Sequence, residues 1–219
     1  IMRISGTILF SIFVGFIFSC EIIDHHHAPK TADEAVIELT EGNERFVNNK
    51  LQHHNFIDEA HLVEKDQHPH TFVLSCIDSR VPPEIVFDQG LGNLFVARVA
   101  GNIEDDNILG SMEYAVQVKG TKLLVILGHS NCGAVQGAID NVNLGHLTQL
   151  TNQIKVAFSK HRTYPLPEHL SNETGRLNVL STIDHILSSS QIIRKMVNNK
   201  KIKIVGAFYD LHTGIVEFL

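Results

Sequence analysis

The sequence predicts an α/β fold, with a central, mainly parallel β-sheet, flanking helices and an N-terminal helical arm. Short apolar runs that are typical of buried strands alternate along the chain with segments whose apolar residues recur at helical spacing. The 219 residues are 43% hydrophobic and 19% charged, which provides enough apolar side chain for a packed core. Because no internal repeat or long linker divides the chain, residues 31–219 are expected to form a single domain.

The domain is expected to begin with the helical arm, which ends near Asn48. Thr31 and Glu34 stand three residues apart, as in a capping box at the start of a helix. The apolar residues that follow them recur at helical spacing. The polar segment 50–70 is interpreted as a connection that contains a short helix around residues 58–63.

Five strands and four further helices are expected after the arm. The strands are residues 71–75, 94–99, 122–127 and 203–208, followed by an edge strand at 214–219. The helices are residues 106–118, a helix that opens at Cys132, and residues 147–161 and 175–197. Strands that alternate with helices favour a mainly parallel sheet with helices on its faces.

The first 30 residues have the features of an export signal followed by a tether. Arg3 precedes an apolar run from Ile4 to Phe18, which is shorter than the roughly 20 residues of a membrane-spanning helix. We expect residues 1–19 to be a signal peptide, Cys20 to be lipidated as in a lipoprotein, and residues 20–30 to be a tether. The alternatives are an ordinary signal peptide and an uncleaved anchor. All of them predict an exported domain, in the periplasm or cell envelope.

Charge and cysteine content argue against two other classes of protein. The chain has 18 Lys and Arg against 24 Asp and Glu, a formal net charge of -6, which argues against nucleic acid as a partner. Three cysteines are too few, and odd in number, for a disulfide framework in a chain of this length. Each cysteine therefore needs an explanation of its own.

Cys76, His129 and Cys132 are the candidate metal ligands. Cys76 follows one predicted strand directly, and the other two residues follow another strand. Open α/β sheets place ligand sites just past the carboxyl ends of their strands. Two thiolates and one imidazole are a ligand set of catalytic zinc, which keeps the fourth position open. The spacing alone leaves three alternatives: a disulfide between the two cysteines, a redox pair, and unconnected core residues.

Two motifs resemble the paired signature of the β-class carbonic anhydrases. They are Cys76-Ile77-Asp78-Ser79-Arg80-Val81-Pro82 and Gly128-His129-Ser130-Asn131-Cys132-Gly133. Further segments are similar to that family in the same order, so the resemblance covers most of the chain from about residue 31: 41–46, 88–90, 95–102, 113–116 and 206–214. The resemblance implies a β-carbonic anhydrase-like domain with one Zn²⁺ per chain, bound by Cys76, His129 and Cys132.

The resemblance also implies catalytic roles for Asp78 and Arg80. Zinc lowers the pKa of its bound water to about 7, which supplies hydroxide that attacks carbon dioxide. Asp78 is expected to orient this hydroxide, and Arg80 to keep Asp78 ionised and away from the metal. In some family members the matching aspartate is itself the fourth ligand, which closes the site.

Substrate binding is assigned by the resemblance to Gln67, Phe95, Tyr114 and Gly133. In the family some of the pocket's aromatic residues come from a neighbouring subunit, so a homodimer or a larger homo-oligomer is expected. Some family members also bind bicarbonate at an inhibitory second site through a Trp. This chain has no Trp, so that site is not expected here.

The expected function is the reversible hydration of carbon dioxide to bicarbonate and a proton. One alternative is hydrolysis of carbonyl sulfide or carbon disulfide at the same site. The other is a non-catalytic zinc-binding or redox protein of the cell envelope. The expected partners are the small-molecule substrate, further copies of the chain and, through the lipid on Cys20, the membrane.

Overall fold

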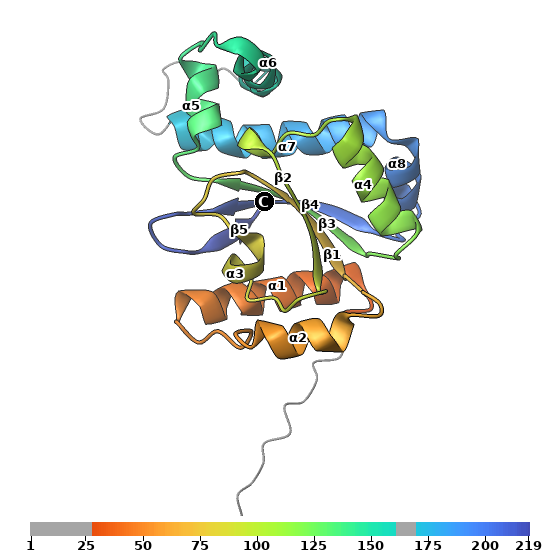
Figure 1. Cartoon of the computed structure of the whole chain (residues 1–219). Helices are drawn as coiled ribbons and strands as arrows, with labels where there is room; N and C mark the ends of the chain where they lie inside the picture. Colours follow the sequence, from red (N-terminus) through yellow and green to blue (C-terminus); the bar gives the residue numbers. More distant parts are fainter. Residues whose placement is uncertain (1–27, 161–169) are drawn as a thin grey trace, which may run out of the picture.

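The computed structural model describes residues 28–160 and 170–219. A five-stranded sheet with the order β2-β1-β3-β4-β5 forms its centre (Figure 1). The strands are β1 (Thr71–Ser75), β2 (Leu94–Arg98), β3 (Leu123–His129), β4 (Lys203–Tyr209) and β5 (Val216–Phe218). The first four strands run parallel to one another, and β5 is an edge strand antiparallel to β4. This confirms the predicted fold class.

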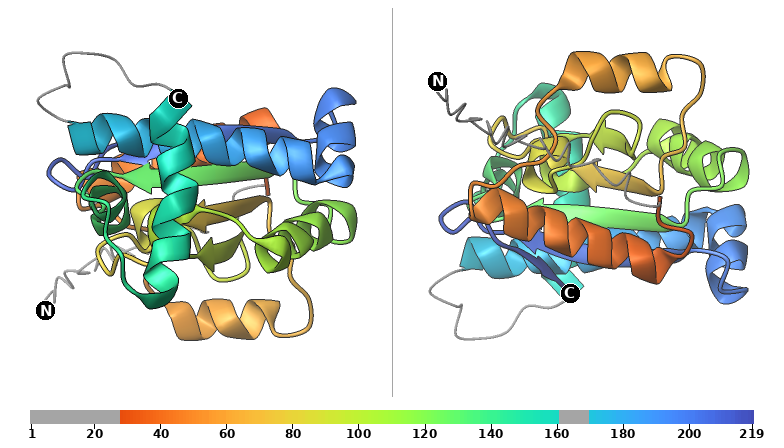
Figure 2. Two further views of the ribbon diagram at one scale, coloured as in Figure 1. Left: turned by 90° about the horizontal axis from the view of Figure 1, so that it is seen from above. Right: turned by 90° about the horizontal axis from the view of Figure 1, so that it is seen from below.

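Helices cover both faces of the sheet and the edge at which β1 and β3 end. On one face lie α1 (Ala32–Val47) and α3 (Pro83–Val86), and on the other lie α4 (Asp106–Gln117), α7 (Leu170–Ser189) and α8 (Gln191–Asn198). Beyond the β2 edge lies α2 (Phe56–Val63) (Figure 2). The remaining elements, near the carboxyl ends of the strands, are the 3-10 helix η1 (Ala100–Asn102), α5 (Gly133–Ile139) and α6 (Gly145–Lys160). None of the described helices combines the length and apolar character needed to cross a bilayer.

The arm begins at Thr31, as the capping-box pattern predicts. The Glu34 amide donates to Thr31 Oγ1 at 3.2 Å, and the Thr31 amide donates to Glu34 Oε2 at 3.2 Å. These two hydrogen bonds satisfy amides that have no acceptor within the helix. The helix then packs Ala35 and Leu39, both fully buried, against the sheet.

Alternation along β3 supplies apolar side chains to both faces. Val125 and Leu127 belong to the core cluster that includes α1, whereas Leu124 and Ile126 belong to the cluster that includes α4, α7 and α8. A strand between two helical layers buries both of its faces, so its sequence is continuously apolar. This burial fixes the strand whose end carries His129.

The helical segment predicted at residues 175–197 is confirmed, but it is broken at Ser190 into α7 and α8. The Ser190 hydroxyl accepts a hydrogen bond from the Ile193 amide at 3.1 Å, which makes it the N-cap of α8. The same hydroxyl donates to Glu113 Oε1 on α4 at 2.6 Å. A side chain that competes for backbone amides in this way starts a new helix with a new direction.

Candidate metal centre

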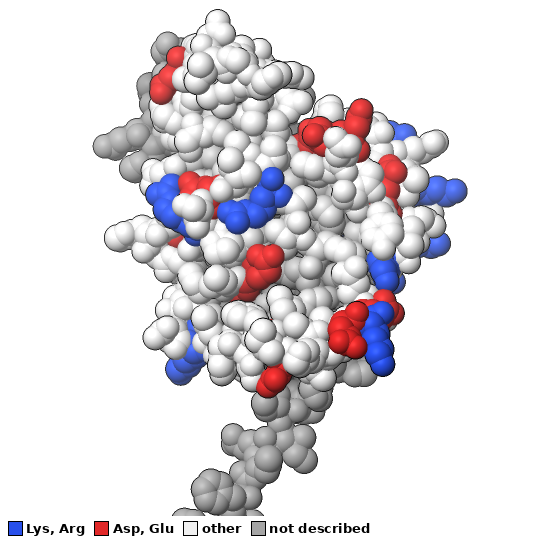
Figure 3. Space-filling model, viewed as in Figure 1, with Lys and Arg blue, Asp and Glu red and all other residues white. Residues whose placement is uncertain are grey.

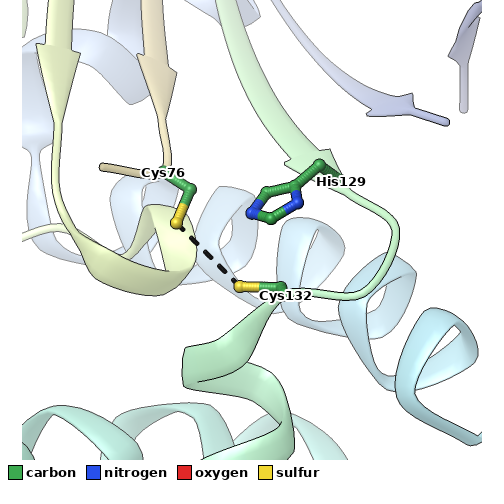
Figure 4. Close-up of side chains that lie close together, drawn as sticks. All are labelled: Cys76, His129 and Cys132. Atoms are coloured by element: carbon green, nitrogen blue, oxygen red, sulfur yellow. Dashed lines mark hydrogen bonds between the residues drawn. The ribbon is translucent and has the colours of Figure 1, made fainter. Parts of the chain in front are cut away.

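Three residues from separate segments meet at the carboxyl edge of the sheet. Cys76 directly follows β1, His129 ends the neighbouring strand β3, and Cys132 is the N-cap of α5. Their side chains point toward one another (Figure 4), and the three candidate ligand atoms all lie within 4.8 Å of one another. All three residues are buried. We call them the Cys2His cluster.

The two sulfurs are spaced as ligands of one ion rather than as a disulfide. Cys76 Sγ and Cys132 Sγ lie 3.9 Å apart, and both cysteines are free. A disulfide bond is about 2.05 Å long. Two thiolates at about 2.3 Å from a tetrahedral zinc ion lie about 3.8 Å apart, which matches the observed spacing.

The His129 ring directs one nitrogen into the cluster. Its Nδ1 lies 2.9 Å from the Ser130 carbonyl oxygen, which can only accept, so Nδ1 carries the proton and Nε2 has a free lone pair. Nε2 is buried and has no hydrogen-bond partner among the residues that the structure describes. A buried polar atom without a partner is costly and is explained when it binds a metal ion. The donor set and this free nitrogen fit zinc.

Hydrogen bonds stabilise a thiolate at Cys76. The Cys132 thiol, its neighbour, and the Gly101 amide 3.4 Å from Sγ lower the pKa of Cys76 well below the usual value of a thiol. The negative charge on Cys76, together with burial, raises the pKa of Cys132. A divalent cation between the sulfurs would favour the thiolate form of both.

Asp78 lies beside the cluster and is held by Arg80. Arg80 Nε donates to Asp78 Oδ1 at 2.9 Å, and Nη2 donates to Oδ2 at 2.7 Å. This two-point contact with the guanidinium is the main reason why the pKa of Asp78 is well below its usual value. Asp78 Oδ2 is 4.0 Å from His129 Nε2, so the carboxylate reaches the edge of the cluster while it is bound to Arg80.

Arg98 is a site residue that the sequence analysis did not single out. It ends β2, and its Nε donates to the Cys76 carbonyl at 3.0 Å while Nη2 donates to the Asp78 carbonyl at 2.5 Å. One guanidinium therefore fixes the backbone on both sides of Ile77. The sequence did carry one signal for this role: Arg98 lies near the end of a predicted strand, in the same sheet as the strand that precedes Cys76.

Three of the predicted pocket residues are not near the cluster within one chain. Gln67 is exposed and precedes β1, whereas Cys76 follows it, and the five residues of this strand span about 17 Å. Phe95 and Tyr114 contact each other, with ring centroids 6.1 Å apart, and line an open cavity of about 550 Å³ between β2 and α4. Their assignment to the substrate pocket of the same chain therefore has no support in this geometry.

Gly133 does lie at the cluster. It is exposed, begins α5 directly after Cys132, and a Cβ added there would meet no atom within 4 Å. The space beside Gly133, next to Cys132, therefore holds no described protein atom. Cys20 and the predicted signal peptide lie outside the described residues.

The fold and the Cys2His cluster define the chain as an α/β protein with a mononuclear metal centre. The family model for carbonic anhydrase matches residues 71–216, a span that contains the cluster, Asp78 and Arg80. The chain belongs to the carbonic anhydrase family, and its fold is that of the β class.

Relatives and solved structures agree with this assignment. Carbonic anhydrase 2 of Mycobacterium tuberculosis is 36% identical over 182 residues, which cover 80% of this chain and 87% of the relative. The carbonic anhydrase of Mycolicibacterium smegmatis is 35% identical over 185 residues, which cover 82% of this chain and 89% of the relative. A tetrameric β-carbonic anhydrase of Sordaria macrospora superposes with a TM-score of 0.65 at 26% identity, covering 84% of this chain and 93% of that one. A β-carbonic anhydrase of Aspergillus fumigatus superposes with a TM-score of 0.69 at 22% identity, and the match covers 85% of this chain and 89% of that one.

Proposed function

We propose that the chain catalyses the reversible hydration of carbon dioxide to bicarbonate and a proton. Cys76, His129 and Cys132 would hold one Zn²⁺ per chain. The observation that carries the proposal is the buried, unpartnered His129 Nε2 beside two sulfurs 3.9 Å apart. Zinc, when bound, lowers the pKa of a water molecule to about 7 and so supplies hydroxide at neutral pH.

The protein's own residues orient this chemistry. Asp78 is held ionised by Arg80, so its carboxylate can accept a hydrogen bond at the edge of the cluster. Arg80 occupies both carboxylate oxygens, which keeps Asp78 from turning fully toward His129 Nε2. A storage site for zinc needs ligands but no such orienting pair, so the pair favours an enzyme.

The surroundings suit an apolar, uncharged substrate. Val135, Ala138 and Ile154 are buried against the two cysteines and form an apolar wall that excludes water from this side of the cluster. Carbon dioxide carries no charge and loses little hydration on entering such a site. The bicarbonate product is an anion, and the exposed guanidinium of Arg80 is available at the mouth to attract it.

The active form is proposed to be a homodimer or a larger homo-oligomer. Gln67, Phe95 and Tyr114 are remote from the cluster of their own chain, so a second copy would have to supply them. β2 is the outer strand of the described sheet, and α2 beyond it offers that copy large apolar side chains on its surface: Phe56, Ile57 and Leu62. Analytical ultracentrifugation of the zinc-loaded chain tests this, and a monomer with full activity would contradict it.

Export to the periplasm or cell envelope, with Cys20 lipidated, is proposed from the first 30 residues of the sequence. The apolar run from Ile4 to Phe18 followed by Cys20 supports it. Cell fractionation combined with metabolic lipid labelling tests this proposal. A cytoplasmic, unlabelled pool would contradict it, whereas a labelled envelope pool that disappears in Cys20→Ser would support it.

Stopped-flow hydration of carbon dioxide tests the proposed reaction. The zinc-loaded chain should hydrate carbon dioxide, and the chelator-treated chain should not until zinc is returned. Hydrolysis of carbonyl sulfide by the same sample, without hydration of carbon dioxide, would contradict the proposal and support the alternative substrate class.

A further inference from the structure

Six lysines lie at the amino-terminal edge of the sheet, opposite the Cys2His cluster. We call this surface the basic edge, and its members are Lys30, Lys119, Lys122, Lys200, Lys201 and Lys203. Lys122 precedes β3 and Lys203 opens β4, and the Lys203 amide donates to the Lys122 carbonyl at 3.0 Å. Because β3 and β4 are parallel, these lysines lie at the end of the sheet that faces away from the cluster.

Most of the charge of the basic edge is not neutralised within the described residues. Lys119 pairs with Asp66 at 2.9 Å, and Lys203 pairs with Asp33. The other four ammonium groups have no ion-pair partner in the described part of the chain, and Lys30, Lys200 and Lys201 are exposed. In Figure 3 blue side chains, with some red ones among them, lie along the right-hand margin, over α8 and the start of α1. The edge is thus locally basic on a chain whose net charge is -6.

The N-terminal segment joins the fold at this same edge. Ala28 and Pro29 line a cavity of about 380 Å³ together with Lys30, Lys119 and Lys122. The ten residue-to-residue steps from Cys20 to Lys30 reach at most about 35 Å when fully extended. If Cys20 is anchored in a membrane, as proposed above, the basic edge is the part of the domain tethered nearest to the lipid.

We propose that the basic edge docks the folded domain on an anionic phospholipid surface. Lysines close to an anionic leaflet are attracted by its surface potential, and an unpaired ammonium group keeps the whole of that attraction. Val118, which is 66% exposed beside Lys119, adds an apolar contact at the same surface. In this orientation the Cys2His cluster lies at the far end of the sheet, on the side that faces away from the lipid. The inference rests on the proposed envelope location.

The test measures partitioning of the full chain between water and two kinds of vesicle. One kind is phosphatidylcholine alone, and the other also contains phosphatidylglycerol. The N-terminal segment, including Arg3, is the same in every variant, so a change in the ratio of the two partition coefficients between wild type and variant reports the charged contact of the basic edge. The wild type should prefer the anionic vesicles at low salt and lose the preference at high salt. Lys200→Gln/Lys201→Gln should lower the ratio roughly tenfold or more, since each lysine contributes roughly fivefold.

The matched control is Lys50→Gln/Lys155→Gln, which removes the same charge away from the basic edge. Its ratio should fall much less. An equal fall in both variants, no fall in either, or a wild-type ratio near one would overturn the proposal. Binding of a DNA duplex as tightly as the anionic vesicles would also overturn it, in favour of a general polyanion surface. Carbon dioxide hydration should be unchanged in every variant, and its absence from the wild type would refute the catalytic proposal separately.

Discussion

Arg98 donates a hydrogen bond from Nε to the Cys76 carbonyl at 3.0 Å, and so ties the end of β2 to the residue that bears the first sulfur of the cluster. Its Nη2 donates to the Asp78 carbonyl in the same loop. The lysine ammonium is a single point charge and cannot hold both carbonyls in this geometry.

Arg98→Lys should therefore loosen the loop without removing a ligand. We expect roughly a tenfold loss in both zinc affinity and kcat, the size typical of groups that orient metal ligands. Competition with a chelator and stopped-flow kinetics measure the two effects. Arg194→Lys, at an exposed position on α8, is the control and should change neither. Wild-type values for Arg98→Lys would remove the residue from the account of the site.

Asp78→Asn should separate metal binding from turnover. The amide cannot accept the hydrogen bond as a carboxylate does, whereas the three ligands are untouched. Zinc should remain at one per chain while kcat falls roughly a hundredfold. Asp66→Asn, which breaks an exposed pair with Lys119, is the matched control. If Asp78→Asn kept the wild-type rate, Asp78 would have no part in the mechanism.

Cys132→Ser should abolish zinc binding at neutral pH. A serine hydroxyl does not ionise there and is a poor zinc ligand, so two strong ligands would remain. Metal analysis should find well below one zinc per chain, and hydration should fall with it. Cys20→Ser changes the third cysteine of the chain and should leave the zinc content unaltered. Stoichiometric zinc in Cys132→Ser would refute the ligand assignment.

Asp88 should make folding sensitive to acid. Burial alone would raise the pKa of Asp88, but hydrogen bonds from Arg45 and from the Gln52 and His53 amides outweigh it and lower that pKa. A lowered pKa in the folded state means that Asp88 stabilises the fold above the unfolded pKa of about 3.9. This stabilisation is lost as the pH falls through the folded value.

Asp88→Asn should accordingly lower the free energy of unfolding by about 3 kcal/mol at pH 7, because it leaves the Arg45 charge without its buried partner. Below the unfolded pKa of about 3.9 the difference from the wild type should shrink. Urea unfolding of the two proteins, freed of zinc by a chelator, measures the difference in unfolding free energy at pH 7 and again below the unfolded pKa. Asp33→Asn, at an exposed pair with Lys203, should cost less than about 1 kcal/mol. A difference that did not change with pH would show that Asp88 acts by packing rather than by charge.

The cluster could be predicted because sequence and topology agree there. The centres of β1 (Phe-Val-Leu) and β3 (Leu-Leu-Val-Ile-Leu) are continuously apolar, which indicates buried strands, and buried neighbours in a parallel sheet end at one edge. Cys76 and His129 follow from that arrangement. Their resemblance to a known motif then selected the metal site from the alternatives that spacing left open.

Contacts that depend on which elements are neighbours could not be predicted. Arg98 reaches two carbonyls only because β2 pairs with β1, and no local pattern specifies that pairing. The Ser190 hydroxyl, which caps α8 locally, likewise gains a second hydrogen bond from its position next to Glu113, which is 77 positions away. Gln67 lies nine positions before Cys76, and the strand predicted at 71–75 already separates the two; the subunit from which such a residue reaches a cluster has no local signal in the sequence.

X-ray absorption at the zinc edge of the purified full chain tests the central claim most directly. The account predicts one zinc per chain, with two sulfur neighbours at about 2.3 Å and one imidazole nitrogen at about 2.0 Å. The remaining neighbour should be a light atom such as oxygen. A shell of four sulfurs, a shell without sulfur, or a chain that binds no zinc while all its cysteines are reduced would contradict it.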